Sequence, residues 1–196
     1  MTEDEIEQCF PNLRRDDFKI TSPTDVNYNC IAWAGGDTKN WWQPSGAKYY
    51  VWLRDDKSES LENYIENFKL LGYSEETESR DYEPEFEKVA LYIDADGLPS
   101  HAAKQKDNGF WTSKLGWSED IEHRTLECLE GDDYGVVKVI LKRRRKGKEE
   151  ADISKTKASE QIKNFKNLAR NTVNVPKKEV DAVKGQTKKK TNKTDK

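Results

Sequence analysis

The clearest helical pattern in the chain follows Ser60. Apolar side chains recur there at intervals of three and four residues, at Leu61, Tyr64, Ile65, Phe68 and Leu71. Serine is a residue type that caps helix N-termini, and Gly72 stands where a helix often ends in a left-handed residue. The pattern therefore predicts an amphipathic helix over residues 61–71.

A second, shorter helix is predicted to begin at Asn29 or Cys30. Residues 25–29 are rich in residues that favour turns and helix N-caps, and the small apolar run 30–34 follows them. Gly35 and Gly36 close this run. A short polar helix is also expected near the N-terminus, ahead of the helix-breaking Pro11.

The second half of the chain contains mostly strand patterns. Apolar runs at 89–93 and 136–141 predict strands, and the segments 101–105 and 110–115 flank Asp107-Asn108-Gly109, a strong hairpin signal. Residues 119–130 predict a helix, with Ile121, Leu126 and Leu129 as its apolar positions. Helices followed by a meander of strands are typical of an α+β domain.

Charge divides the 196 residues into two parts. Residues 1–140 hold 15 basic and 30 acidic side chains, whereas residues 141–196 hold 19 basic and 7 acidic ones. The tail is poor in apolar residues and cannot bury enough surface to offset its ordering entropy. We therefore expect a domain over 1–146 and a basic, largely disordered tail over 147–196. Within the tail, residues 160–172 fit either a short amphipathic helix that docks on the body or a partner, or a weakly structured spacer.

Several classes of protein are disfavoured by the sequence. No apolar run approaches the ~20 residues of a membrane span, and the acidic N-terminus does not resemble a signal peptide. The cysteines Cys9, Cys30 and Cys128 lie far apart, and neither paired metal-ligand spacings nor glycine-rich nucleotide motifs occur. The sequence predicts a cytoplasmic protein that needs no metal or cofactor and does not bind membranes.

Cys30 is the residue whose context is most informative. A thiol at the start of a helix feels the positive end of the helix dipole and lies near unpaired backbone N–H groups. Both effects favour the thiolate and lower the pKa of the thiol, and the same N–H groups can stabilise an oxyanion. Cys128 lies inside an apolar run typical of structural cysteines, and Cys9 lies near the chain end.

A thiol nucleophile needs a base, and the chain has two histidines, His101 and His123. His101 opens a predicted strand, and the small residues Ala102 and Ala103 leave room beside its imidazole. His123 lies at the start of the helix predicted over 119–130. A catalytic pair is adjacent in the fold rather than in the sequence, so His101 is a candidate base for Cys30.

The order of a helix-start cysteine, a longer helix and a strand histidine resembles the papain-like cysteine hydrolases over residues 25–141. The resemblance implies a papain-like α+β fold, with N-terminal helices packed on a small antiparallel sheet. It implies that Cys30 is the nucleophile and His101 the general base, with Asn29 or Asn27 beside the oxyanion hole. Ser113, Asp120 and His123 remain alternatives for the third residue, which orients the imidazole.

A closer resemblance is carried by NYNCIAWAGGDTKNWW (27–42), EFEKVALYIDADGLPSHAAKQ (85–105), WTSKLG (111–116) and DIEHRTLECLEGDDYG (120–135). These four blocks are similar to those of an uncharacterised bacterial domain family, and they carry a fold expectation without a reaction. The leading hypothesis is a cysteine hydrolase or transferase acting on an amide or acyl bond of a protein or peptide.

The alternative hypothesis is a non-catalytic binding module. Its basic tail, KRRRKGK at 142–148 and KKK at 188–190, would engage an acidic partner or nucleic acid. The tail could equally fold back onto the acidic body. Tryptophans, among them Trp111, could form a stacking platform for a substrate, although filling a small core is the more ordinary use of such rings.

Overall fold

The computed structural model describes residues 1–145 and Gly147, and Met1–Arg145 form one compact unit. A seven-stranded antiparallel sheet has the order β1-β8-β7-β6-β5-β9-β4. Its strands are β1 (Phe18–Ile20), β4 (Glu75–Thr77), β5 (Phe86–Ile93), β6 (Pro99–Gln105), β7 (Trp111–Lys114), β8 (Asp120–His123) and β9 (Val136–Arg144). The short strands β2 (Trp41–Trp42) and β3 (Tyr50–Val51) form a separate parallel pair.

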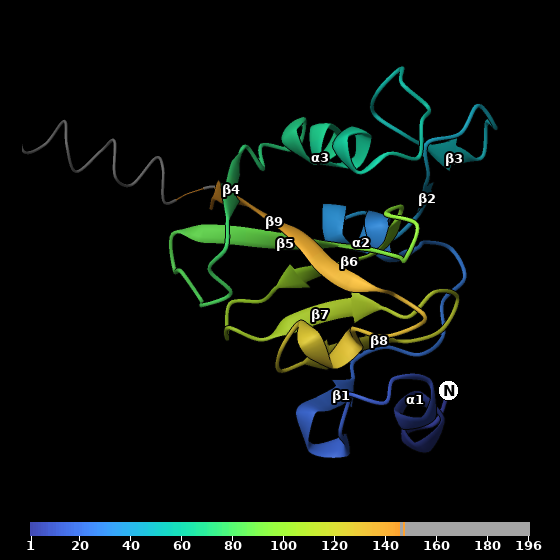
Figure 1. Cartoon of the computed structure of the whole chain (residues 1–196), viewed down its shortest axis with the longest axis vertical. Helices are drawn as coiled ribbons and strands as arrows, with labels where there is room; N and C mark the ends of the chain where they lie inside the picture. Colours follow the sequence, from blue (N-terminus) through green and yellow to red (C-terminus); the bar gives the residue numbers. More distant parts are fainter. Residues whose placement is uncertain (146, 148–196) are drawn as a thin grey trace, which may run out of the picture. The chain divides into compact units, whose positions relative to one another are not determined.

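Helices cover both faces of the large sheet. The α-helices are α1 (Glu3–Cys9), α2 (Cys30–Gly35) and α3 (Leu61–Lys69), and two 3-10 turns span Arg15–Asp17 and Glu127–Leu129. One core cluster, which we call the α1 side, joins Ile6 of α1 to Trp111 and Ile121 of the sheet. The other, the α2 side, joins Cys30 to Ala102. Figure 1 shows α1 beside β1, α3 toward β4, and α2 against the middle strands.

Most of the predicted elements are confirmed. The helix capped by Ser60 ends near Gly72, which has a φ of 90°, and the helix capped by Asn29 begins at Cys30. Strands β5, β6, β7 and β9 lie where the apolar runs predicted them, and β6 and β7 pair across the Asp107–Gly109 turn. The α+β class follows from this arrangement, although the sheet is larger than predicted.

The helix predicted over residues 119–130 is wrong. Residues Asp120–His123 form strand β8 between β7 and β1, and only a 3-10 turn follows at Glu127–Leu129. All four residues of β8 are buried, because the sheet is covered on both faces. Pairing with two neighbouring strands satisfies the backbone polar groups of this segment and outweighs its local helical pattern.

The start of the basic run belongs to the sheet and not to the tail. Strand β9 continues to Arg144, beyond the predicted end at Leu141. Lys142 Nζ lies 3.1 Å from Glu83 Oε2, and Arg143 Nη2 lies 2.6 Å from Glu87 Oε2. These cations therefore contribute to the body's own ion pairs. The helix predicted at 160–172 lies outside the described residues.

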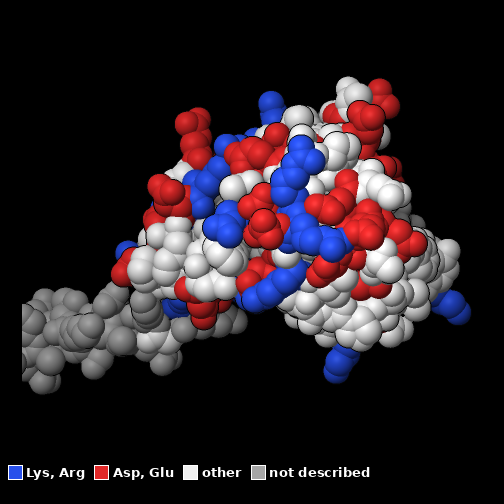
Figure 2. All heavy atoms as spheres, turned by 90° about the horizontal axis from the view of Figure 1, so that it is seen from below, with Lys and Arg blue, Asp and Glu red and all other residues white. Residues whose placement is uncertain are grey.

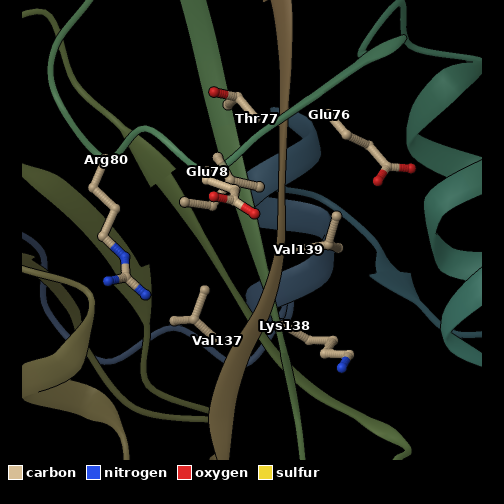
Figure 3. Close-up of a pocket in the computed structure, with 8 residues that line it drawn as sticks. Glu76, Thr77, Glu78, Arg80, Val137, Lys138 and Val139 are labelled. Atoms are coloured by element: carbon tan, nitrogen blue, oxygen red, sulfur yellow. The ribbon is translucent and has the colours of Figure 1, made fainter.

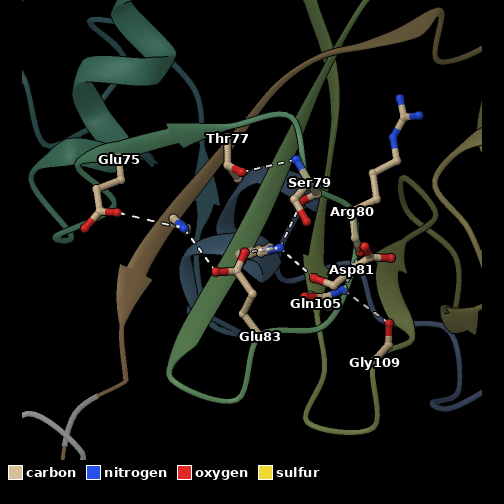
Figure 4. Close-up of polar contacts among 10 residues, drawn as sticks. Glu75, Thr77, Ser79, Arg80, Asp81, Glu83, Gln105 and Gly109 are labelled. Atoms are coloured by element: carbon tan, nitrogen blue, oxygen red, sulfur yellow. Dashed lines mark hydrogen bonds and ion pairs between the residues drawn. The ribbon is translucent and has the colours of Figure 1, made fainter.

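A buried ammonium group ties the loop before β5 to the sheet. Lys88 is fully buried; its Nζ donates to the carbonyls of Ser79 (2.9 Å) and Asp81 (2.6 Å) and pairs with Glu83 at 2.7 Å. Figure 4 shows Ser79, Asp81 and Glu83 around this ammonium group. Glu83 also pairs with Lys142 at 3.1 Å. Because each hydrogen of the ammonium has an acceptor, its burial is compensated.

Gly135 makes the tight turn that leads into β9. Its φ is 70°, and a Cβ atom at this position would lie 1.8 Å from the carbonyl oxygen of Ile93. The backbones of this turn and of β5 therefore approach more closely than any larger residue permits. Tyr134, immediately before this glycine, is fixed in place by the same turn.

Surface charge on the body is mixed. Figure 2 shows acidic and basic side chains interspersed on one face. Arg124 pairs with Asp17 at 3.2 Å, and Lys19 pairs with Glu122 at 2.8 Å. Within the part of the chain that the structure describes, no helix is long and apolar enough to cross a membrane.

Candidate functional site

Cys30 is the first residue of α2, and local hydrogen bonds hold it there. The Asn29 side-chain oxygen accepts from the amides of Ala32 (3.1 Å) and Trp42 (3.2 Å), and its Nδ2 donates to the Trp42 carbonyl at 2.9 Å. One asparagine thus caps the helix and attaches the tryptophan loop to it. Its polar atoms are all engaged in this task.

The expected lowering of the Cys30 pKa is wrong. Burial raises the pKa of the thiol from 9.0 to about 11. The backbone amides of Ala102, Ile31 and Cys30 and the charge of Lys114 oppose this rise without cancelling it. Burying a thiolate carries a large desolvation cost. A six-residue helix and a few amide contacts stabilise the thiolate by less than this cost. The resting thiol is therefore protonated at neutral pH.

His101, Ser113 and His123 form a buried hydrogen-bonded chain across β6, β7 and β8. Ser113 Oγ lies 3.0 Å from His101 Nε2 and 2.9 Å from His123 Nε2. His123 Nδ1 lies 2.7 Å from the Thr125 carbonyl oxygen. The register Ala103↔Ser113 and Trp111↔His123 brings these side chains together on the α1 side of the sheet.

The hydrogen-bond partners of His101, Ser113 and His123 determine which ring nitrogen of each histidine carries the proton. The Thr125 carbonyl only accepts, so His123 carries its proton on Nδ1 and its Nε2 accepts from the Ser113 hydroxyl. Ser113 Oγ then accepts from His101, which carries its proton on Nε2. His101 Nδ1 is left with a lone pair, and this buried atom has no hydrogen-bond partner among the described residues. The chain is directional, and its open end is a proton acceptor.

Both imidazoles are neutral at physiological pH. Burial, reinforced by the neighbouring His123, holds the pKa of His101 well below 6.5. Burial also lowers the pKa of His123 to about 4, although the Thr125 carbonyl and the charge of Glu122 favour its protonated form. The His101 ring is stacked on Tyr134, with centroids 3.9 Å apart and planes within 7°.

Cys30 and His101 approach β6 from different sides. The Cys30 sulfur meets the amide of Ala102, the residue after His101, and belongs to the α2-side cluster. The His101 ring contacts Tyr92, Ser113 and Tyr134, which lie in or against the α1-side cluster. Tyr134 is the residue that connects them, because it also lines a cavity with Cys30. The structure thus brings both residues to the same end of β6 without a hydrogen bond between them.

The remaining predicted site residues have other roles in the structure. Asn27 is exposed and binds Asp25 through its amide groups at 2.8 Å. Asp120 accepts a 2.7 Å hydrogen bond from the buried Tyr28 hydroxyl and makes no described contact with either histidine. Trp111 is 2% exposed and packs in the α1-side core. Of the three candidates for an imidazole-orienting residue, Ser113 contacts His101 directly and His123 contacts it through Ser113.

A cavity of about 320 Å³ opens at the Cys30 thiol. Aromatic residues make up much of its wall: Trp41, Trp42, Tyr64, Trp117 and Tyr134. The polar side chains of Gln43, Glu59 and Ser100 also line it. A concave, mostly apolar site with a few polar groups is the usual form of a small-ligand pocket, and here it has a nucleophile in its wall.

A larger groove of about 640 Å³ lies elsewhere, between the end of β4 and β9. Figure 3 shows Glu76, Glu78, Arg80 and Lys138 around it. No cysteine or histidine lines this groove, so it has less to offer for acyl chemistry. Within residues 1–145 and 147, no cluster of His, Cys, Asp or Glu could hold a metal ion.

Sequence reasoning missed two residues near the thiol. Lys114 is fully buried on β7, lies over the Tyr28 ring with its Nζ 5.1 Å from the centroid, and donates to the Ser118 carbonyl. Its charge is felt by Cys30. Tyr134 was missed because its position depends on the Gly135 turn. The sequence did offer one indication of Lys114, because a lysine inside a strand that is otherwise buried is unusual.

The fold and the site define an α+β domain with a pocketed thiol and a buried His-Ser-His chain. Residues 19–142 match the sequence profile of a family described as Domain of unknown function (DUF7689). The chain therefore belongs to this family, which fits the expectation of an uncharacterised domain family; the four sequence blocks themselves stay a prediction. No curated protein and no solved structure gives a significant match.

Proposed function

We propose that this domain is a cysteine-dependent hydrolase or transferase of the papain-like type, acting on an amide or related acyl bond. Cys30 is its nucleophile and His101 its general base. The observation that carries the proposal is the bare, buried Nδ1 of His101, at the open end of a hydrogen-bonded chain next to the strand position that the Cys30 sulfur contacts. An acceptor held in one tautomer by a second group is the arrangement that nucleophilic catalysis uses.

The reaction begins from a neutral pair and not from a thiolate–imidazolium pair. The resting contacts contain no hydrogen bond between the Cys30 thiol and His101, which pack against opposite faces of the sheet. Proton transfer therefore requires a rearrangement at the end of β6, where Tyr134 stacks on His101 and lines the cavity with Cys30. His101 Nδ1 takes the proton while the sulfur bonds to the acyl carbon, and the carbonyl electrons move to oxygen. Collapse of this intermediate breaks the bond to the leaving group, which receives the proton from Nδ1. Water, or an acceptor amine or alcohol, then attacks the thioester and releases the thiol.

The role of Ser113 and His123 is to accommodate the positive charge. When Nδ1 of His101 is protonated, its Nε2 proton can pass to Ser113 while the serine proton passes to His123 Nε2. The charge then rests on His123, where the Thr125 carbonyl and Glu122 favour the protonated form. Ser113 thereby orients the His101 ring and relays its proton, and His123 accepts the positive charge.

Activity of the full chain against peptide amides, esters and thioesters tests the proposal. We expect turnover that is abolished in Cys30→Ala and retained in Cys9→Ser, because Cys9 is exposed and does not line the pocket. His101→Gln is expected to lower kcat by about 100-fold or more, as for loss of a general base. Turnover that survives Cys30→Ala would overturn the proposal. Lys114→Met tests the alternative base. If Lys114→Met abolishes turnover and His101→Gln does not, Lys114 is the residue that accepts the thiol proton.

The binding-module hypothesis rests on residues mostly outside the described part of the chain and stays a prediction. Among the described basic residues at its start, Lys142 and Arg143 already pair with Glu83 and Glu87. Deletion of residues 148–196 therefore provides its test, since it spares β9. Salt-sensitive binding of nucleic acid or an acidic protein that is lost on deletion would support it. The cytoplasmic location expected from the sequence likewise stays a prediction.

A further inference from the structure

The wall of the cavity at Cys30 has a marked chemical asymmetry. Among its described lining residues, Glu59 is the one side chain with a formal charge at neutral pH, and it is negative. Gln43 Nε2 donates to Glu59 Oε1 at 3.2 Å, which orients the carboxylate. No cationic side chain among the described lining residues competes for this carboxylate.

Two indoles of the cavity have their N–H groups bound elsewhere. Trp41 Nε1 donates to the Val26 carbonyl at 2.7 Å, and Trp42 Nε1 donates to Asp37 Oδ2 at 2.9 Å. The Trp41 and Trp117 rings lie 4.2 Å apart, and Trp117 is 64% exposed. Trp41 and Trp42 therefore offer ring faces to a ligand rather than N–H groups, and a ring face attracts a cation.

We propose that the cavity binds a cationic side chain of the substrate, a lysine-type ammonium or arginine-type guanidinium, next to the acyl bond presented to Cys30. The aliphatic stem packs against the indole rings, and the charged end meets the Glu59 carboxylate. A carboxylate or neutral side chain of similar size lacks the charge interaction. The inference deepens the proposed function, because it names the substrate class of the same site.

Binding to full-chain Cys30→Ala tests the inference without depending on turnover. N-acetyl-lysine amide, N-acetyl-norleucine amide and N-acetyl-glutamate amide have similar lengths and differ in charge. Isothermal titration calorimetry is expected to show that the lysine amide binds about tenfold more tightly than the other two, since cation–π contacts and a carboxylate contact together supply such a difference.

Two variants assign the effect to the cavity. Glu59→Gln is expected to remove most of the lysine preference and leave norleucine binding unchanged. The matched control is Glu62→Gln, an exposed glutamate of α3 that does not line the cavity. Equal binding of lysine and norleucine amides, no binding of any of the three, or a preference unaffected by Glu59→Gln would overturn the inference. These outcomes would not contradict the proposal that Cys30 is the nucleophile. Preferential binding of the lysine amide by a protein that shows no turnover would support the cation site and contradict the proposed hydrolase.

Discussion

Lowering the pH from 7 to 5 is expected to destabilise this protein through its two buried histidines. An unfolded His123 binds a proton near pH 6.5, whereas the folded one does so only at about 4. Between these values the unfolded state therefore holds more protons, so folding stability falls as the pH falls. Linkage gives a loss of about 2 kcal/mol at pH 5 for His123 alone, rising to about 3 kcal/mol at pH 4. His101, whose pKa is also held well below 6.5, adds a loss of the same sign.

Urea unfolding followed by tryptophan fluorescence at pH 7, 6 and 5 measures this loss. Glu119 and Glu122 together add only about 0.3 kcal/mol to the loss by pH 5. Hydrogen bonds outweigh burial and lower the pKa of each from 4.5 to about 2, so their main contribution lies below this window. His123→Gln is less stable at pH 7, but its stability should fall by about 2 kcal/mol less between pH 7 and 5. A wild-type stability that stays flat over this range, or an equal slope in His123→Gln, would refute a neutral buried chain.

Three substitutions probe other parts of the structure. Ser113→Ala breaks the hydrogen-bonded link between the imidazoles and should cost about 1–3 kcal/mol of stability. It should also lower kcat about tenfold at an unchanged KM. An unaltered kcat would contradict the positioning role of Ser113. Lys88→Met should cost about 2 kcal/mol and speed proteolytic cleavage within residues 79–83, because the carbonyls that it binds lose their donor; unchanged cleavage would contradict the clamp. Gly135→Ala should cost more than about 3 kcal/mol in denaturant unfolding, since its Cβ would overlap the Ile93 carbonyl; a smaller cost would show that the turn relaxes.

Local signals in the sequence were enough for several elements. A cap residue, helical spacing and a terminal glycine predicted α3, and Asp107-Asn108-Gly109 predicted the turn between β6 and β7. The α2 helix start at Cys30 was equally local. These features depend on neighbouring residues alone, so one sequence suffices to find them.

The parts that were missed depend on strand register. The segment Asp120–His123 becomes a strand only because β1 and β7 are there to pair with it. The same pairing turns His123 from a helix-start residue into a partner of Ser113, so the chain to His101 could not be predicted from spacing. The direction of the shift in the Cys30 pKa was missed, because it depends on how deeply the start of the helix is buried.

The most direct test of the account is acylation by p-nitrophenyl acetate, followed by release of nitrophenol and by mass mapping of the acylated residue. The account predicts a burst of one equivalent, an acetyl group on Cys30, and acylation at least about 100-fold slower in His101→Gln than in Cys9→Ser. Acetylation at the exposed Cys9 alone, or a rate at Cys30 that is indifferent to His101→Gln, would contradict a nucleophile activated by the buried chain.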